Sequence, residues 1–263
     1  MAQSTLALGF TEFSAEVGRY LGYGSSSSSW TADQTTEITR LVNAGVRRFY
    51  NPPIVPPDPT PHRWSFLAPT YSFNTTASDY DYDLPDGYGE IDGPIHYDNA
   101  ETARHQIELT SPERLLMLRG RDVATGFPQY AAVRPKAQTS GTFQIWELLL
   151  WPTPSDTLTL HLSYFRQVDQ LSASNPYPYG GAVHSETIMA SCLAEAERRF
   201  NDESSIHKVD FMERLAVSIA QDRRAHESST LGYNGPRTWR KNAGGHTLRS
   251  YGATLTLDGG AFP

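Results

Sequence analysis

Six prolines crowd residues 52–62 of the 263-residue chain. No helix can continue through such a stretch, because proline lacks a backbone N–H and disfavours helical geometry in the residue before it. Before the prolines apolar residues recur at helical spacing, between residues 91 and 165 they alternate as in strands, and after Gly180 the helical period returns. The pattern predicts an α+β protein: a four-helix unit, built from two N-terminal and two C-terminal helices, with an inserted antiparallel β domain.

The N-terminal helical half, residues 1–53, is predicted to hold two helices joined by a flexible serine-rich linker at residues 25–29. The first helix has Thr11 as its candidate N-cap and Gly22 as its stop. The second begins at Thr31, which starts a capping-box pattern, and ends at the prolines. Its apolar face is predicted to consist of Ile38, Leu41, Val42, Gly45 and Phe49.

The inserted β domain, residues 54–182, is predicted to contain strands at residues 91–97, 105–109, 130–133, 142–150 and 157–165. In the last strand apolar and mostly polar residues alternate, as expected of an antiparallel sheet with one solvated face. Ser111 and Pro112 predict a single helical turn between strands.

The C-terminal helical hairpin, residues 183–228, carries two apolar stripes that predict two helices. Its stripes are Ile188, Cys192, Ala196 and Phe200, then Val209, Met212, Leu215 or Ala216, and Ile219. Because neither helical pair can bury its face alone, the two pairs are expected to pack together. Residues 229–263 have no helical stripe and are expected to form an extended C-terminal arm, in which the alternation from Tyr251 to Leu257 predicts a strand added to a neighbour.

The net charge of −7 is unevenly distributed. Residues 61–110 hold nine acids against two arginines, whereas residues 229–263 carry four cations against Asp258 alone. A protein that binds nucleic acid needs a basic face, so this distribution argues against that class. An acidic surface on a partner protein suits the basic arm at least as well.

Cys192 is the only cysteine, which excludes an internal disulfide and a cysteine zinc site. The chain has no apolar run of about 18 residues, so no transmembrane helix is predicted, and its first residues lack a signal-peptide pattern. We therefore expect a protein made and folded in a reducing cytoplasm.

One segment, residues 79–90, invites a metal-site interpretation. Asp79, Asp81, Asp83 and Glu90 have the spacing of positions 1, 3, 5 and 12 in a calcium-binding EF-hand loop. Position 6 needs glycine for its sharp turn and holds Leu84 instead. The alternative, a strand of alternating Tyr and Asp that runs into a Leu-Pro-Asp-Gly turn, is favoured.

No motif predicts an enzyme. The chain lacks a phosphate loop, a dinucleotide fingerprint, a zinc-protease motif and a nucleophile elbow, and its eight histidines are dispersed. Cys192 falls in an apolar stripe and is predicted to be a buried thiol, while the pairs Arg47-Arg48 and Arg198-Arg199 suit helix C-termini as dipole partners. No catalytic residue, cofactor or metal is predicted.

Three segments are familiar together: residues 30–34 with the helix end at residues 41–53, residues 82–87, and residues 148–154 with the strand and loop that follow. With the closing hairpin, and over roughly residues 10–228, the chain resembles the head–tail adaptor (neck or connector) proteins of tailed bacteriophages. The resemblance implies a virion protein of the neck, assembled in the host cytoplasm with no membrane association. It also implies a ring, usually dodecameric, that docks on the portal, extends the DNA channel, and presents a surface to a tail or stopper protein.

The resemblance also suggests site residues. Such adaptors often hold the portal with their C-terminal segment, and the candidates in this arm are Arg237, Trp239, Arg240, Lys241, Arg249 and Tyr251. Double-stranded DNA is expected to pass without specific binding, and an acidic lining favours sliding. Candidates for the channel or the ring surface are Asp79, Asp81, Asp83, Asp86 and Glu90.

Two other functions stay open. The Tyr- and Trp-rich β region is compatible with a carbohydrate- or host-surface-binding virion module, which would bind saccharide as an isolated monomer or trimer. The acidic segment alone is compatible with an enzyme that cleaves cell-wall glycan, which a turbidity assay would detect.

Overall fold

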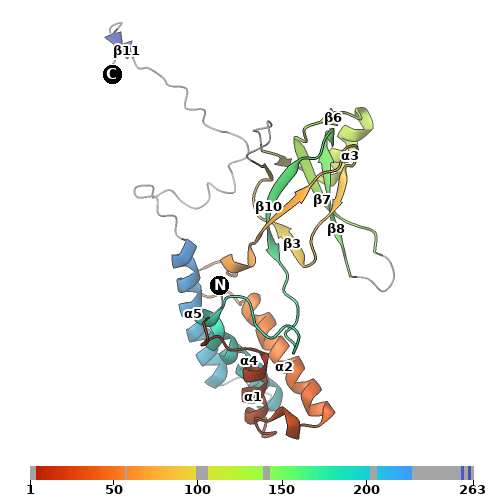
Figure 1. Cartoon of the computed structure of the whole chain (residues 1–263). Coiled ribbons are helices and arrows are strands. Elements are labelled where there is room, and N and C mark those ends of the chain that lie inside the picture. The colour runs from red at the N-terminus through yellow and green to blue at the C-terminus, as the bar shows by residue number, and fades with distance from the viewer. Residues whose placement is uncertain are drawn as a thin grey trace. The chain divides into compact units, whose positions relative to one another are not determined.

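The computed structural model describes residues 4–56, 58–98, 106–138, 143–201 and 206–226, together with the short segments 256–257 and 260–261. These residues form two compact units, 1–227 and 228–263. The first unit combines helices with mainly antiparallel sheets (Figure 1), so the predicted α+β class is confirmed. The domain boundaries predicted within it stay a prediction. None of the helices in these ranges combines the length and apolarity needed to span a membrane.

Four helices share one apolar core: α1 (Phe10–Tyr20), α2 (Ala32–Tyr50), α4 (Ser185–Asn201) and α5 (Ile206–His226). Helix α4 is central, since α1, α2 and α5 all pack against it. Helices α2 and α4 approach each other closely at Gly45, where a Cβ atom would lie 2.5 Å from the Cα of Cys192. Ser191 secures this contact because its hydroxyl donates to the Gly45 carbonyl over 2.8 Å.

The helix caps confirm one prediction and correct another. Thr31 and Gln34 form the predicted capping box, in which the Gln34 N–H donates to Thr31 Oγ1 and the Thr31 N–H donates to Gln34 Oε1. Helix α1, however, is capped by Gly9 rather than Thr11, because the Glu12 carboxylate accepts the Gly9 N–H over 2.9 Å. The serine-rich linker also differs from expectation, since it contains a 3-10 helix, η1 (Ser27–Ser29).

The predicted apolar stripes are wrong at their ends. Phe200 and Val209 are exposed, with 66% and 58% of their surface accessible, and Phe211 lies fully buried in the core instead. A shift of two residues turns a helix by more than half a circle, so Phe211 faces α4 while Val209 faces away. Within the stripes, Ile188, Cys192, Ala196, Leu215 and Ile219 are buried as predicted.

The β part of the first unit contains two main sheets. One is formed by β1 (Thr70–Asn74), β10 (Thr159–Arg166), β3 (Tyr88–Ile91) and β4 (His96–Tyr97). The other has the order β2 (Asp81–Asp83), β8 (Trp146–Trp151), β7 (Tyr130–Pro135) and β5 (Glu108–Leu109). A short parallel pair, β6 (Thr125–Gly126) and β9 (Thr153–Pro154), completes the strands of this part.

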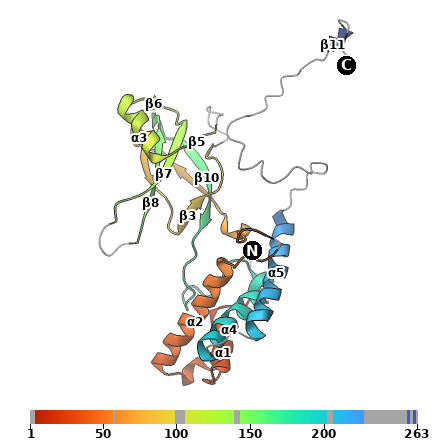
Figure 2. The same ribbon diagram turned by 180° about the vertical axis from the view of Figure 1, so that it is seen from behind.

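Helix α3 (Pro112–Arg121) covers the outer face of β7 and β8 (Figure 2). Strand β8 is therefore covered on both sides: Leu148 and Leu150 belong to the core between the sheets, and Leu149 packs against Leu115 of α3. This double burial explains the continuous apolar run of β8. The prediction of a single helical turn here is wrong, because the helix extends over ten residues from its Ser111 cap.

The strands differ from the predicted ones in three further respects. The strand expected at residues 91–97 is two short strands, β3 and β4, that pair with different parts of β10. Strand β1 was not predicted, although it pairs with β10 over five residues. Strand β5 pairs with β7 in parallel, within a sheet that is otherwise antiparallel.

In the second unit, β11 (Thr256–Leu257) and β12 (Gly260–Ala261) pair with each other in antiparallel fashion. The strand that the arm is predicted to add to a neighbour stays a prediction.

Candidate functional site

The acidic segment forms a strand and a turn. Asp81 and Asp83 lie at the ends of β2, and the Tyr88 N–H donates to the Pro85 carbonyl across the turn over 3.0 Å. Gly87 has a φ of 74°, a conformation that favours glycine. The interpretation of a strand that runs into a turn is confirmed, and the ranges that the structure describes contain no group of three His, Cys, Asp or Glu residues able to hold a metal.

Two of the five acidic candidates already have basic partners. Lys136 Nζ donates to Asp83 Oδ1 over 2.6 Å, and Arg63 pairs with Glu90. The Arg63 guanidinium also lies over the Phe165 ring, 3.8 Å from its centre. Asp79 accepts the Tyr80 N–H through its side chain, while Asp81 and Asp86 make no ion pair with a described residue. That these side chains face a channel or the ring surface stays a prediction.

The six residues predicted to dock on the portal lie outside the described residues: Arg237, Trp239, Arg240, Lys241, Arg249 and Tyr251. Their role stays a prediction.

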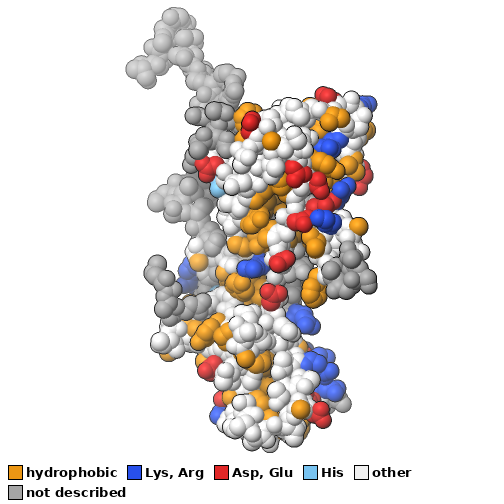
Figure 3. Space-filling view, turned by 45° about the vertical axis from the view of Figure 1, so that its right-hand side comes forward, with side chains coloured by type: hydrophobic (Ala, Val, Ile, Leu, Met, Phe, Trp, Pro, Cys, Tyr) orange, Lys and Arg blue, Asp and Glu red, His pale blue; other side chains and the backbone are white. Residues whose placement is uncertain are grey.

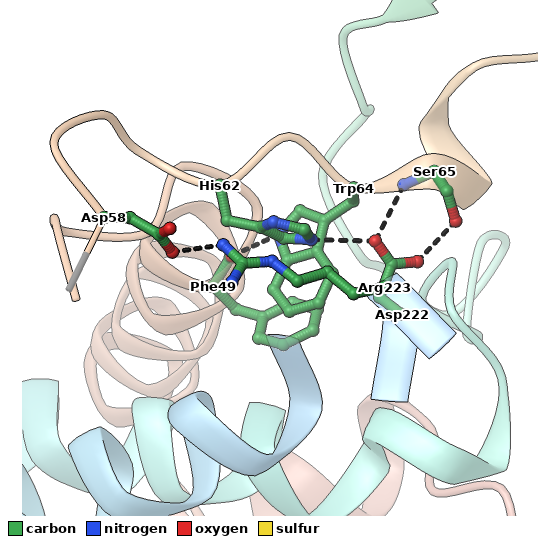
Figure 4. Close-up of polar contacts among 7 residues, drawn as sticks. All are labelled: Phe49, Asp58, His62, Trp64, Ser65, Asp222 and Arg223. Carbon is green, nitrogen blue, oxygen red and sulfur yellow. Dashed lines mark hydrogen bonds and ion pairs between the residues drawn. The ribbon is translucent and has the colours of Figure 1, made fainter. Parts of the chain in front are cut away.

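A polar cluster centred on the buried Asp222 ties the proline-rich connector to the last turns of α5 (Figure 4). Asp222 of α5 accepts hydrogen bonds from His62 Nε2, over 2.7 Å, from the Ser65 N–H, over 3.2 Å, and from the Ser65 hydroxyl. One residue further on, Arg223 pairs with Asp58 of the connector. We call this set of residues (Asp58, His62, Ser65, Asp222 and Arg223) the connector clamp.

Aromatic rings cover the connector clamp on its inner side. The Trp64 ring stacks on Phe49 at 4.5 Å and its indole N–H donates to the Phe49 carbonyl over 2.8 Å. His184, in the 3-10 helix η3 (Ala182–His184), packs against the same rings, is only 5% exposed, and has no hydrogen-bond partner for Nδ1 in the described structure. The connector is thereby fixed to both α2 and α5 before the chain enters β1.

Burial and hydrogen bonding set the protonation of the cluster. Burial raises the pKa of the Asp222 carboxyl, but hydrogen bonds from Ser65 and His62 outweigh burial, so the pKa lies below its ordinary value. Burial lowers the pKa of His184, and the nearby Asp222 only partly offsets this effect. Asp222 is therefore an anion and His184 is neutral at neutral pH.

The cluster brings together Ser, His and Asp without forming a catalytic triad. In a triad the histidine lies between the serine and the acid and takes the proton of the serine. Here Asp222 lies between the other two residues, and the Ser65 hydroxyl donates to the carboxylate. Burial also raises the pKa of the Cys192 thiol, so this thiol is not an activated nucleophile. The arrangement fixes backbone segments.

A second polar feature, the arginine groove, lies between α2 and α4 and has a volume of about 400 Å³. Figure 3 shows basic side chains gathered along one edge of the helical part. The groove is lined by Arg40, Leu41, Ala44, Arg47, Glu195, Arg198 and Arg199.

Neither the connector clamp nor the arginine groove has a local signal in the sequence. His62 and Asp222 are 160 residues apart in the chain, and no local pattern relates them. Arg48 and Arg198 lie in the last turns of their helices, where partners of helix dipoles are expected, and both also donate to the buried Glu195 carboxylate, over 2.7 and 2.9 Å. The signal that could have indicated the groove was the presence of an arginine pair near the end of each of two helices expected to pack together.

Comparison with known proteins points to one family. The family model described as SU10 adaptor protein matches residues 9–239. The match includes both helical pairs, the strands between them and the beginning of the arm. No curated protein matches the chain.

Proposed function

The chain belongs to the SU10 adaptor protein family, a family of phage head–tail adaptors, and from this premise we propose that it forms a ring that docks on the portal and extends the DNA channel toward the tail. The observation that carries the proposal is the extent of the match over residues 9–239, because it includes the β part as well as the helices. The β part therefore belongs to what this family shares. As a phage adaptor, the chain has a structural role in the virion neck.

The finer points of the proposal follow from the family. The ring is a dodecamer, the arm docks on the portal through its basic and aromatic residues, and the far side presents a surface to a tail or stopper protein. DNA passes through without sequence-specific binding. The chain performs no catalysis, and the connector clamp supports this, since the Asp222 carboxylate holds both the Ser65 hydroxyl and His62.

The test is to mix the purified full chain with portal rings and to image the product by electron microscopy. We expect a second ring, coaxial with the portal and around its channel. A chain ending at Ser228 keeps the described helices and strands of the first unit and serves as the matched variant; we expect its portal affinity to fall at least tenfold. Copies located away from the DNA exit route would overturn the proposal.

The acidic segment is tested separately in virions. Replacing Asp79, Asp81 and Asp83 by asparagine removes three negative charges from a segment proposed to face the channel or the ring surface. We expect slower DNA ejection from particles that assemble normally. Unchanged ejection kinetics would remove this part of the proposal and leave the ring itself unaffected.

A further inference from the structure

The arginine groove holds more positive charge than its acidic residue can neutralise. Both oxygens of Glu195 are occupied, one by Arg48 and the other by Arg198. Arg40, Arg47 and Arg199 form no ion pair with any residue that the structure describes, and all three are exposed. Three guanidinium groups that have no ion-pair partner among the described residues thus line one groove, in a protein whose net charge is −7.

The geometry favours a ligand with evenly spaced anionic groups. Arg40 and Arg47 are two turns apart on α2, about 10.5 Å along the helix axis, which equals the rise of about three base pairs of DNA. Arg198 and Arg199 approach from α4, on the other side of the groove. The planar guanidinium group binds phosphate oxygens in a bidentate manner.

The lining of the groove argues against a protein partner. Protein interfaces centre on aromatic or large apolar anchors, yet the apolar residues in this groove are Leu41, which is buried, and the small Ala44. The adjacent Phe200 lies against Tyr20 of α1, with ring centres 6.4 Å apart, and is not part of the groove. A site formed by charge with little apolar surface is typical of contact with a nucleic acid backbone.

We propose that the arginine groove contacts the phosphate backbone of double-stranded DNA, without reading its sequence. The inference rests on the proposed function, in which duplex DNA passes the ring, and it names the residues that touch this DNA. Binding is weak and strongly dependent on salt, because each phosphate contact releases counterions. A weak contact of this kind lets DNA slide, and it is compatible with acidic residues elsewhere on the ring.

The test measures binding of the full chain to a 40-base-pair duplex of random sequence by fluorescence anisotropy, between 50 and 200 mM NaCl. The variant carries Arg40→Gln, Arg47→Gln and Arg199→Gln, and the matched control carries Arg19→Gln, Arg121→Gln and Arg224→Gln. The arm cations are present in both. We expect the groove variant to lose about tenfold or more in affinity at 50 mM NaCl and its salt slope to fall by about 2 to 3, since each lost contact removes about 0.9. The control keeps both values close to those of the unmodified chain.

Three results would overturn the proposal. The first is an equal loss in the control, which would mean that net charge alone matters. The second is a groove variant that binds DNA normally but no longer docks on portal rings, which would make the groove a protein contact. The third is the absence of duplex binding by both the free chain and its complex with the portal. Ring formation is scored separately by electron microscopy, so failure of this inference is distinguishable from failure of the proposed function.

Discussion

The helical part and the β part of the first unit bury their apolar residues in different ways. The helices share one continuous core around α4, whereas the β part divides its apolar residues between the space separating the two sheets and the space under α3. The polar contacts differ as well. The helical part buries the Asp222 and Glu195 carboxylates. The β part buries one carboxylate, Glu147, which pairs with Arg134, but its Arg63–Glu90 and Lys136–Asp83 pairs are exposed.

This difference suggests a division of roles. Buried and paired polar groups fix one arrangement of the connector and the helices, because an alternative arrangement would leave charges without partners. Exposed pairs impose little geometry and contribute little stability. The helical part is thus the scaffold that holds the connector. Substitutions in its core and in the connector clamp should therefore cost more stability than substitutions in the exposed pairs of the β part.

Replacing Phe211 by alanine is expected to have the largest effect. The side chain is fully buried in the helical core, and its removal should lower the free energy of unfolding by about 3–5 kcal/mol. Val209→Ala, two residues away on the same helix, is the control and should change stability by less than about 0.5 kcal/mol. Urea unfolding followed by circular dichroism measures both, and equal losses would contradict the corrected orientation of α5.

Removing the carboxylate of the connector clamp should cost somewhat less. Asp222→Ala leaves the His62 and Ser65 side chains buried without their acceptor, and we expect the free energy of unfolding to fall by about 3 kcal/mol. Asp210→Ala is the control on the same helix, because its pair with Arg214 is exposed, and should cost less than about 1 kcal/mol. Thermal unfolding measures both variants. Similar losses of stability in the two would show that the connector clamp contributes no more than an exposed ion pair.

The buried His184, beside the connector clamp, should make the helical part sensitive to mild acid. The pKa of His184 is lowered by burial, so the unfolded chain binds this proton more tightly than the folded chain does. Stability is therefore fully present above the ordinary histidine pKa of about 6.5 and falls as the pH drops below it. Asp222, whose pKa is also lowered, adds a further loss below its ordinary value of 3.8.

His184→Phe tests this pH dependence. The ring fits among Phe49, Trp64 and Phe66 and carries no proton, so the variant should lose less stability than the unmodified chain between pH 7 and pH 5. His62 and Asp222 are the titratable neighbours and are present in both proteins. Urea unfolding at several pH values gives the change in unfolding free energy with pH for each protein. Identical pH dependence in the two proteins would exclude His184 as its source.

The exposed pair of the acidic segment should have the smallest effect. A double-mutant cycle with Asp83→Ala and Lys136→Ala is expected to give a coupling energy below about 1 kcal/mol, because both side chains are about half exposed. The coupling should nearly disappear in 1 M NaCl, where the screening length is about 3 Å. A larger coupling energy that persists in 1 M NaCl would contradict the proposed difference between the helical part and the β part.

The elements that could be predicted from sequence are those whose signals are local. Helix α2 is an example, because Thr31 and Gln34 define its beginning and Pro52 its end within one segment. Strand β1 was missed because it is short and its partner, β10, lies about 90 residues further along the chain. The orientation of α5 was wrong because apolar residues such as Val209 and Val217 also occupy its exposed side, so two stripes compete in the sequence.

The candidate sites could be predicted only in part. The concentration of acidic residues in residues 79–90 is evident from the sequence, but the pairing of Glu90 with Arg63 and of Asp83 with Lys136 depends on the fold. The arginine groove could not be predicted, because it forms where the face of α2 with Arg40 and Arg47 meets the end of α4. Helical periodicity indicates which face of a helix is buried, but it does not indicate which helix lies beside the exposed face.

The close approach of α2 and α4 at Gly45 has a practical consequence. It encloses the sulfur of Cys192, the sole thiol of the chain, so a maleimide reagent can reach that sulfur only after the two helices separate. The rate of alkylation therefore measures how often the helical bundle opens. It also means that a cysteine introduced at an exposed position of the first unit would be the one site for a fluorophore in the folded protein, with Cys192 left in place.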